Sequence, residues 1–346
     1  MSPIGSYDVQ GWRGEGWLSA AAVAVCVLVL VGLVACTGGP EGTDGGGGQE
    51  ESGPSARADP DSLSVYLEAG RTHFRLGQHD EAIAAFRRTL IVAPRKPGVR
   101  YALAMSLRAR HRHAEAVAEL GQAVALAPEK AEYHFRYGEA LLAIDDVPGA
   151  LVALDLAVRR DSTHANARLD RGRLLAQLNR LSEAEVDFER VRTLQPGNVW
   201  AHLGLGGIYT QQGRHPEAIA ALEDAVRLEP RNAHAHYLLS QAFWRSGQQR
   251  KREDALQEFR RLSRAWEHLK QGAILAERGA IDQAIAAWER AVEADSTCMD
   301  AYLRLGEAHM GAGRPEPARR AFRRVLELEP EHANVREQLV RMEEEL

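Results

Sequence analysis

The sequence predicts an all-α protein built as a solenoid of about eight stacked helix pairs. The first observation is a period, because a small residue recurs 34 residues apart over most of the chain, for example from Gly172 to Gly206. In all copies but one, alanine follows twelve positions later, and a large apolar residue follows the alanine by four. Prolines near the ends of most copies supply the third observation, since they would stop a helix there. The small positions are Gly70, Ala104, Gly138, Gly172, Gly206, Ser240, Gly272 and Gly306.

Each copy predicts two short antiparallel helices joined by a turn. In the fifth copy Leu205 and Tyr209 recur at helical spacing before a glycine turn, and a second helical pattern begins near Ala218. Gly206 and Ala218 carry almost no side chain, so the two helix backbones can approach closely there. Pro230 then ends the second helix. A single pair cannot bury its apolar face alone, so we expect the copies to stack on one another.

At these residues the chain resembles the tetratricopeptide repeat family, which implies a right-handed α-α superhelix. Pro94, Pro128, Pro196, Pro230 and Pro330 occupy the family's closing proline position, and serine replaces it at 162 and 296. Residues 333–346 resemble the capping helix that ends such arrays. The eight copies are placed at residues 63–96, 97–130, 131–164, 165–198, 199–232, 233–264, 265–298 and 299–332.

The sixth copy departs from this spacing. Ala255 follows Ser240 by fifteen residues instead of twelve, which lengthens the turn by three. The stretch after it contains no proline and no other stop before the glycines of the seventh copy. We therefore expect the second helix of the sixth copy to continue into the first helix of the seventh. A non-helical break between Leu262 and Glu267 would contradict this expectation.

The N-terminus carries an uncharged apolar run from Leu18 to Val34. As a helix it would span about 25 Å, short of the roughly 30 Å of a bilayer core. The last residues before Cys36, Leu-Val-Ala, together with Cys36 resemble the lipobox at which bacterial lipoprotein signal peptidase cuts. We expect residues 1–35 to be a cleaved signal peptide and Cys36 to carry lipid, with an uncleaved anchor as the alternative.

The segment from the lipidated Cys36 to residue 61 is predicted to be a disordered linker. Residues 37–61 contain eight glycines and no large apolar side chain, so they cannot bury enough surface to fold. Because a lipoprotein signal peptide and a lipidated cysteine direct a chain to the bacterial cell envelope, the envelope is the expected location. By resemblance to Gram-negative sorting rules, Thr37 after the cysteine favours the outer membrane, with the repeats facing the periplasm.

Charge and cysteine content narrow the classes of partner. The whole chain carries −5, and the acidic linker accounts for most of it, which leaves the repeats close to neutral. A near-neutral array lacks the basic footprint of a nucleic-acid-binding protein. With Cys26 in the signal segment and Cys36 lipidated, Cys298 has no disulfide partner in the chain. We interpret it as a semi-buried structural thiol.

No motif in the sequence indicates catalysis, a cofactor or a resident metal. Zinc-protease, nucleophile-elbow, phosphate-loop and paired-cysteine patterns are all missing. Two closely spaced histidine pairs could be considered as metal ligands: His111 with His113, and His234 with His236. However, residues two apart on a helix point in different directions, so neither pair converges on one ion. We therefore interpret these histidines as surface or groove residues, and the chain as a protein that is not an enzyme.

The resemblance also implies a partner-binding groove. In the family, the second, fifth, ninth, twelfth and thirteenth residues of each copy's first helix line a concave surface. We expect Trp200, Tyr237, Trp244 and Trp266 to anchor a partner segment, because aromatic side chains dominate many interfaces. Their packing between repeats is the alternative, and Trp288 is assigned to the core. The candidate groove residues are Tyr101, Phe135, Trp200, His234, Tyr237, Gln241, Trp244 and Trp266.

These features predict a membrane-tethered scaffold or adaptor that recruits or assembles envelope proteins through its groove. Its partners would be peptide segments of other proteins, with the membrane reached through the lipid. One alternative is a non-catalytic specificity subunit of an envelope hydrolase or glycosyltransferase. Another is direct binding of glycan or peptidoglycan by the aromatic residues.

Overall fold

The computed structural model describes residues 60–344, and every regular element in this range is an α-helix. The predicted signal segment, Cys36 and nearly all of the predicted linker lie outside the described residues. Within the described range no helix is both long enough and apolar enough to cross a bilayer. The helices are α1 (Pro60–Arg75), α2 (His79–Val92), α3 (Pro97–Ala109), α4 (His113–Leu126), α5 (Ala131–Leu142), α6 (Val147–Arg160), α7 (Ala165–Gln177), α8 (Leu181–Leu194), α9 (Val199–Gln211), α10 (His215–Leu228), α11 (Ala233–Arg245), α12 (Gln249–Glu277), α13 (Ile281–Ala294), α14 (Met299–Gly311), α15 (Pro315–Leu328) and α16 (Ala333–Glu344).

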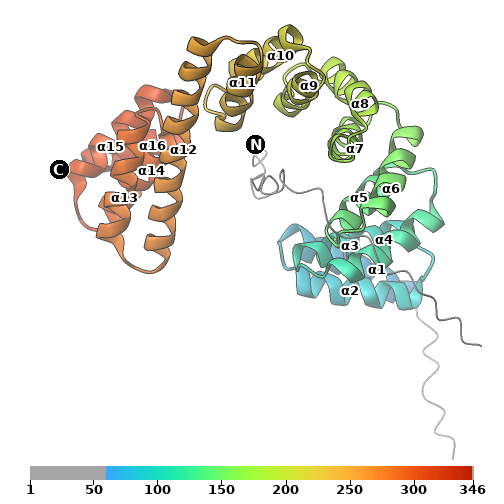
Figure 1. Cartoon of the computed structure of the whole chain (residues 1–346). Helices are drawn as coiled ribbons and strands as arrows, with labels where there is room; N and C mark the ends of the chain where they lie inside the picture. The colour runs from blue at the N-terminus through green and yellow to red at the C-terminus, as the bar shows by residue number, and fades with distance from the viewer. Residues whose placement is uncertain (1–59, 345–346) are drawn as a thin grey trace, which may run out of the picture. The chain divides into compact units, whose positions relative to one another are not determined.

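Consecutive helices pair, and each pair packs on the next, as Figure 1 shows. We call the first helix of a pair the A helix and the second the B helix. The A helices are α1, α3, α5, α7, α9, α11, the C-terminal part of α12, and α14. The B helices are α2, α4, α6, α8, α10, the N-terminal part of α12, α13 and α15. The described residues thus confirm the predicted helical solenoid of about eight pairs.

The long helix α12 confirms the prediction made from the sixth copy. It runs without interruption from Gln249 to Glu277, and no break separates Leu262 from Glu267. Its N-terminal part packs on α11 and its C-terminal part on α13, so one helix belongs to two repeats. Leu262 and Ala265 are buried at the joint.

The last helix, α16, covers the end of the array. Val335, Leu339 and Met342 turn inward and pack with Phe322 of α15 in one apolar cluster. Charged residues such as Arg336 and Glu337 lie on its exposed side. A helix that is apolar on one face and polar on the other can close a stack whose final pair would otherwise expose its core.

In six repeats the small position is a glycine that accommodates the large residue sixteen positions later. A Cβ added to Gly206 would lie 2.4 Å from Leu222 Cγ, and one added to Gly272 would lie 2.3 Å from Trp288 Nε1. Both large side chains are buried, and the indole of Trp288 donates to the carbonyl of Leu269 at 3.2 Å. The core assignment of Trp288 is therefore confirmed, and the period reflects direct contact between helices A and B.

Each A helix ends in the same turn. Its second-last or third-last residue accepts a hydrogen bond from the amide five positions along, for example Arg112 N to Leu107 O at 2.9 Å, around a residue with positive φ. This is a Schellman motif, in which the left-handed residue is usually glycine. Five repeats place glycine there, whereas the others place His111, Asp145 and Asn179. All three belong to the non-glycine types that tolerate this conformation best.

At most junctions between repeats, a histidine or arginine at the start of the A helix hydrogen-bonds to a backbone carbonyl at the end of the preceding repeat. His134 Nε2 lies 2.9 Å from the carbonyl oxygen of Pro128, and His236 makes the same contact with Pro230 at 2.9 Å. Arg100 donates to the carbonyl of Pro94 from the equivalent position. We call this contact the junction latch. It corrects the interpretation of His236 as a surface or groove residue, because its ring is buried where it holds the turn.

Where serine replaces the closing proline, an aspartate and a threonine order the turn instead. Thr163 donates to Asp161 Oδ1 through its backbone amide at 2.8 Å and its hydroxyl at 2.7 Å. Thr297 makes the same two contacts with Asp295, at 3.0 and 2.7 Å. This Asp-Ser-Thr turn compensates for the missing ring constraint of proline.

Asp295 also joins repeats that are not neighbours. Its carboxylate is fully buried and accepts from Arg231, in the turn between α10 and α11, at 3.0 Å. Arg261 of α12 contacts its other oxygen. Burial alone would raise the pKa of Asp295, but the bonds from Thr297 and the two guanidinium groups hold it below its ordinary value. We call Arg231, Arg261 and Asp295 the α12 clamp, because it ties together the segments on either side of α12.

Candidate partner-binding surface

The candidate surface consists of positions two, five, nine, twelve and thirteen of the A helices. Each A helix packs on its own B helix. In addition, the A helix α7 contacts the next A helix, α9, and α9 contacts α11. Equivalent positions on these neighbouring A helices therefore lie side by side and form one continuous surface. We call it the A-helix surface.

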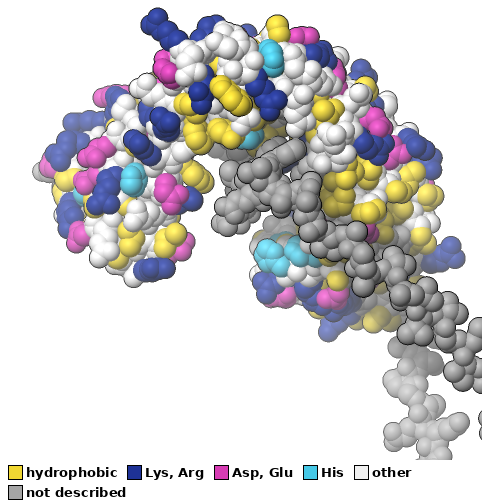
Figure 2. All heavy atoms as spheres, viewed as in Figure 1, with side chains coloured by type: hydrophobic (Ala, Val, Ile, Leu, Met, Phe, Trp, Pro, Cys, Tyr) yellow, Lys and Arg dark blue, Asp and Glu magenta, His cyan; other side chains and the backbone are white. Residues whose placement is uncertain are grey.

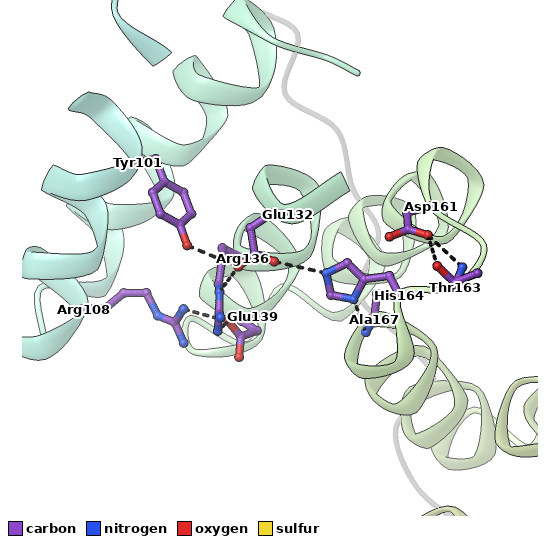
Figure 3. Close-up of polar contacts among 9 residues, drawn as sticks. All are labelled: Tyr101, Arg108, Glu132, Arg136, Glu139, Asp161, Thr163, His164 and Ala167. Atoms are coloured by element: carbon purple, nitrogen blue, oxygen red, sulfur yellow. Dashed lines mark hydrogen bonds and ion pairs between the residues drawn. The ribbon is translucent and has the colours of Figure 1, made fainter. Parts of the chain in front are cut away.

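The part of this surface on α3 and α5 is a closed network of charged groups (Figure 3). Arg136 bridges two carboxylates of its own helix, Glu132 at 2.7 Å and Glu139 at 2.9 Å. From α3, Arg108 donates to Glu139 at 2.8 Å and the Tyr101 hydroxyl donates to Glu132 at 3.2 Å. The charges satisfy one another, so this part of the surface has no unpaired ionic group to offer a ligand.

The protonation behaviour of this network follows from its geometry. Burial would raise the pKa of Glu132, but hydrogen bonds from Arg136 and His164 outweigh it and hold the pKa below its ordinary value. Burial also raises the pKa of Tyr101, and the neighbouring Glu132 charge adds to this. The carboxylate therefore stays ionised and the phenol neutral at physiological pH.

Asp170 of α7 borders the network and behaves differently. Burial raises its pKa to about 6, the distant contact with Arg173 opposes the rise, and the Glu139 charge increases it. The nearest approach of Arg173 to its carboxylate is 3.8 Å, which is too long for a strong hydrogen bond. Asp170 is thus a carboxyl group whose ionised form is poorly stabilised where it stands.

Farther along, the A-helix surface changes from charged to aromatic. Trp244 of α11 is 60% exposed, Trp266 of α12 is 50% exposed and Tyr237 is 39% exposed. Trp200 of α9 is half-buried and lies under the guanidinium of Arg173, 5.5 Å from its ring centroid. We call these four residues the aromatic patch. Figure 2 shows hydrophobic side chains gathered over α9 and α11, with some basic side chains among them.

Helices α9 and α11 carry almost no charged side chains. Apart from histidines, α9 contains no ionisable side chain of the Asp, Glu, Lys or Arg type, and α11 contains only Arg245. Arg252 of α12 lies over the Trp244 ring, 6.0 Å from its centroid, so a partner that covers Trp244 also meets a guanidinium group. Trp266 lies fourteen residues, about 21 Å, farther along α12 than Arg252, so the two exposed tryptophans lie at separate places within the aromatic patch.

The structure distributes the predicted groove residues unevenly. Gln241 and His234 are half-buried on the A-helix surface, and burial lowers the pKa of His234. Tyr101 is engaged with Glu132 and stacks on Tyr133 with ring centroids 5.1 Å apart. Tyr237 packs on Phe259 at 5.3 Å while keeping one edge exposed.

Phe135 is a correction to the predicted groove. Only 3% of it is exposed, because His164 covers one side of its ring at 4.8 Å and Arg136 lies 4.9 Å from the centroid. It belongs to the core cluster with Leu154. A partner could not reach it without displacing these side chains.

Of the two histidine pairs, only His236 departs from the interpretation as surface or groove residues. His111 occupies the left-handed turn before α4 rather than a helix, and its ring lies 5.9 Å from that of His113 in an edge-on arrangement. His236 points into the junction latch, away from the side on which His234 lies. In residues 60–344 no three histidine, cysteine or acidic side chains are grouped as metal ligands. Cys298 is buried and unpaired, 2% exposed.

Comparison with known families decides where the chain belongs. Two family profiles, both described as tetratricopeptide repeat, match residues 55–99, 101–165 and 146–199, and residues 175–242 and 275–340. The chain belongs to the tetratricopeptide repeat family. Proteins of this family typically act as non-catalytic scaffolds that bind other proteins, and the fold described above is that of such a scaffold. No curated protein matches the chain.

Solved structures resemble this tetratricopeptide repeat chain in fold. A tetratricopeptide repeat protein from Parabacteroides merdae ATCC 43184 superposes with a TM-score of 0.50 at 15% identity, covering 82% of this chain and 99% of that one. MamA gives a TM-score of 0.47 at 23% identity, over 50% of this chain and 94% of its own. YrrB, described as a repeat protein with an unusual peptide-binding site, gives 0.34 at 18% identity, over 63% and 96%.

Proposed function

We propose that this chain is a lipid-tethered adaptor of the bacterial cell envelope, which recruits or assembles partner proteins through its A-helix surface. The observation that supports the proposal is the exposure of Trp244 and Trp266 beside the nearly uncharged helices α9 and α11. Large exposed aromatic side chains are common energetic anchors of protein interfaces. Trp288, by contrast, is buried, so tryptophan in this chain is not exposed by default.

The first test asks whether partner binding depends on exposed apolar residues of the A helices and not on equally exposed residues of the B helices. The chain would be purified with its lipid from native membranes, beside the variant Trp244→Ala/Trp266→Ala and the variant Val152→Ala/Val186→Ala. The two valines are 62% and 64% exposed on B helices, so they match the tryptophans in exposure but not in location. We expect mass spectrometry to identify a partner that is lost only from the tryptophan variant.

Two results would count against this function. Equal recovery of all partners by both variants would remove the aromatic patch from the binding site. Binding of purified muropeptides, measured by isothermal titration and lost in the tryptophan variant, would replace a protein partner by a glycan.

The tether is tested separately at Cys36. Lipid is expected on its thiol, and one acyl chain alone would hold only marginally, so several are expected. The variant Cys36→Ser should leave the membrane fraction and label no longer with a radioactive fatty acid. Membrane retention of this variant would favour an uncleaved anchor formed by the apolar run from Leu18 to Val34.

A further inference from the structure

The first helix pair exposes two large apolar side chains. Val65 of α1 is 62% exposed, and Ile91 of α2 is 82% exposed, more than any other large apolar residue in the described part of the chain. In the second, fourth and fifth copies the residue equivalent to Val65 is Val99, Ala167 or Ala201, and each of these is buried. The described residues contain no repeat before α1 that could cover Val65, so this face of the first pair stays open.

Both apolar side chains lie at one edge of the pair. Because α1 and α2 are paired helices joined by a short turn, the start of α1 lies beside the end of α2. Tyr66, next to Val65, shows this directly, since the guanidinium carbon of Arg88 lies 5.8 Å from its ring centroid. Ile91 follows Arg88 by three residues, about one helical turn, and both are exposed. We call the following residues the N-terminal edge: Val65, Arg88, Ile91, Arg95 and Lys96.

The positive charges of the N-terminal edge have no ionic partner. Arg88, Arg95 and Lys96 are exposed, and their side chains form no hydrogen bond or ion pair with another described residue. Arg100, at the start of α3, is different, because it is paired with a glutamate at 2.6 Å. From residue 60 to residue 67 the sequence contributes one acid, Asp61, so the edge keeps a net positive charge. Unpaired cations therefore gather where the apolar side chains are exposed.

The predicted tether would keep this edge close to a membrane. Residues 37–59 separate the predicted lipid on Cys36 from the start of α1. A glycine-rich coil of this length spans about 25 to 30 Å on average. An array anchored at Cys36 would therefore meet the lipid surface first with the end that carries the N-terminal edge.

The chemistry of the edge selects a lipid surface as its occupant. The linker, residues 37–59, carries five acidic residues against one arginine, but it has no large apolar side chain that could cover Ile91. A second copy of the chain would bring the same positive edge against this one. An anionic bilayer supplies both kinds of contact, because its headgroups attract Lys and Arg and its interfacial region accepts apolar side chains.

We propose that the N-terminal edge docks on an anionic phospholipid surface, with Val65 and Ile91 at the level of the headgroups and the three cations against the phosphates. This inference rests on the proposed function, because the lipid tether is what places the edge beside a membrane. It goes beyond that function, since the docked edge would be a second membrane contact that fixes the orientation of the first helix pair and leaves the later repeats free for partners.

The test places a polarity-sensitive fluorophore on the edge of the full-length lipidated chain. The chain is reconstituted in vesicles of phosphatidylcholine, with or without phosphatidylglycerol, and bound chain is recovered by flotation. The fluorophore is attached to Ile91→Cys or, as the control, to Val186→Cys, because Val186 is 64% exposed on the B helix α8. Cys298 is buried, and the wild-type chain treated with the same label gives the background.

We expect the probe at position 91 to shift to the blue, and to be quenched by a lipid-attached quencher, only in vesicles that contain phosphatidylglycerol. The probe at position 186 should not respond. About 1 M salt should reverse the response, because the Debye length then falls to about 3 Å.

Charge variants in the Ile91→Cys background test the role of the cations. Arg88→Gln/Arg95→Gln/Lys96→Gln should shift the docking equilibrium towards the free state by about a hundredfold, since each basic side chain near an anionic surface contributes a factor of about five. The matched control is the triple variant Arg290→Gln/Arg320→Gln/Arg323→Gln, which should dock like its parent. These three arginines are also exposed and form no ion pair with described residues, but they lie on α13 and α15.

Three outcomes would overturn the docking edge, and they are distinguishable. If the chain floats with the vesicles but the probes at 91 and 186 behave alike, the tether stands and the edge does not touch lipid. If the chain does not float with either kind of vesicle, the tether of the proposed function fails together with this inference. If the probe at 91 is already shielded without vesicles, the linker or a second copy covers the edge, and dependence on protein concentration separates these two.

Discussion

Single residues at the left-handed turns set a measurable part of the stability of the repeats. His111 adopts φ of 56°, where equivalent repeats use glycine, and Gly77 adopts 71° with nothing within 4 Å of an added Cβ. An L-residue in this region costs about 1 kcal/mol. We expect His111→Gly to raise the free energy of unfolding by up to that amount and Gly77→Ala to lower it similarly, as measured by urea unfolding. Opposite signs would mean that the His111 ring contributes more than its backbone loses.

Asp170 gives a prediction about pH at the same scale. Its pKa of about 6 in the folded chain exceeds the roughly 3.9 of an unfolded aspartate, so folding favours the protonated form. Its ionisation therefore removes stability as pH rises from about 4 to about 6, and the loss is complete above this window. We expect Asp170→Asn to stabilise the chain by roughly 1–2 kcal/mol at pH 7 after allowance for partial exposure, and not at pH 3.5. Equal unfolding midpoints at pH 7 would contradict this.

Residue roles were only partly predictable from the pattern. Position within the repeat correctly put Trp244 and Trp266 on an exposed face, because the helical period determines which side of an A helix a residue occupies. It could not reveal that Phe135 is covered, since the covering ring of His164 comes from the next junction. Periodicity reports the face of a helix, whereas exposure depends on what neighbouring repeats place over it.

At the scale of elements, the junction latch explains why helix pairs keep a constant relation to one another. His134 reaches back to the carbonyl of Pro128, and the equivalent Arg168 of the next repeat donates to Ser162 O at 2.8 Å. Either side chain can therefore serve at this position. We expect His134→Arg to retain stability and His134→Leu to lose about 1–3 kcal/mol, because the carbonyl would be left without a donor. Thermal unfolding of both variants checks this, and equal loss in the two would show that packing of the imidazole matters instead.

The length of α12 was predictable, and the clamp across it was not. A turn lengthened by three residues and the lack of a helix stop are local features, visible in a short window around Ala255. The contact between Arg231 and Asp295 joins residues 64 positions apart and depends on how α12 orients two repeats. Nothing in the spacing of either residue indicates the other.

For the whole molecule, the α12 clamp adds a coupling that a simple solenoid lacks. In a stack of repeats each unit contacts only its neighbours, so opening can spread from an end one unit at a time. The α12 clamp links the turn before α11 to the end of α13, across α12 itself. The segment from α11 to α13 should therefore open as one cooperative block.

Removing one partner of the α12 clamp tests this coupling directly. Asp295 is fully buried, whereas Arg231 and Arg261 are partly exposed and Arg261 keeps Glu258 as a second partner, so we expect Asp295→Ala to cost roughly 1–3 kcal/mol. Hydrogen exchange should show amides from α11 to α13 exchanging faster in the variant, while those of α3 to α8 keep their wild-type rates. Arg231→Lys is the milder control, because it keeps the charge and loses the fork geometry. Uniform acceleration along the whole chain would instead mean that the repeats unfold as a single unit, with no boundary at α12.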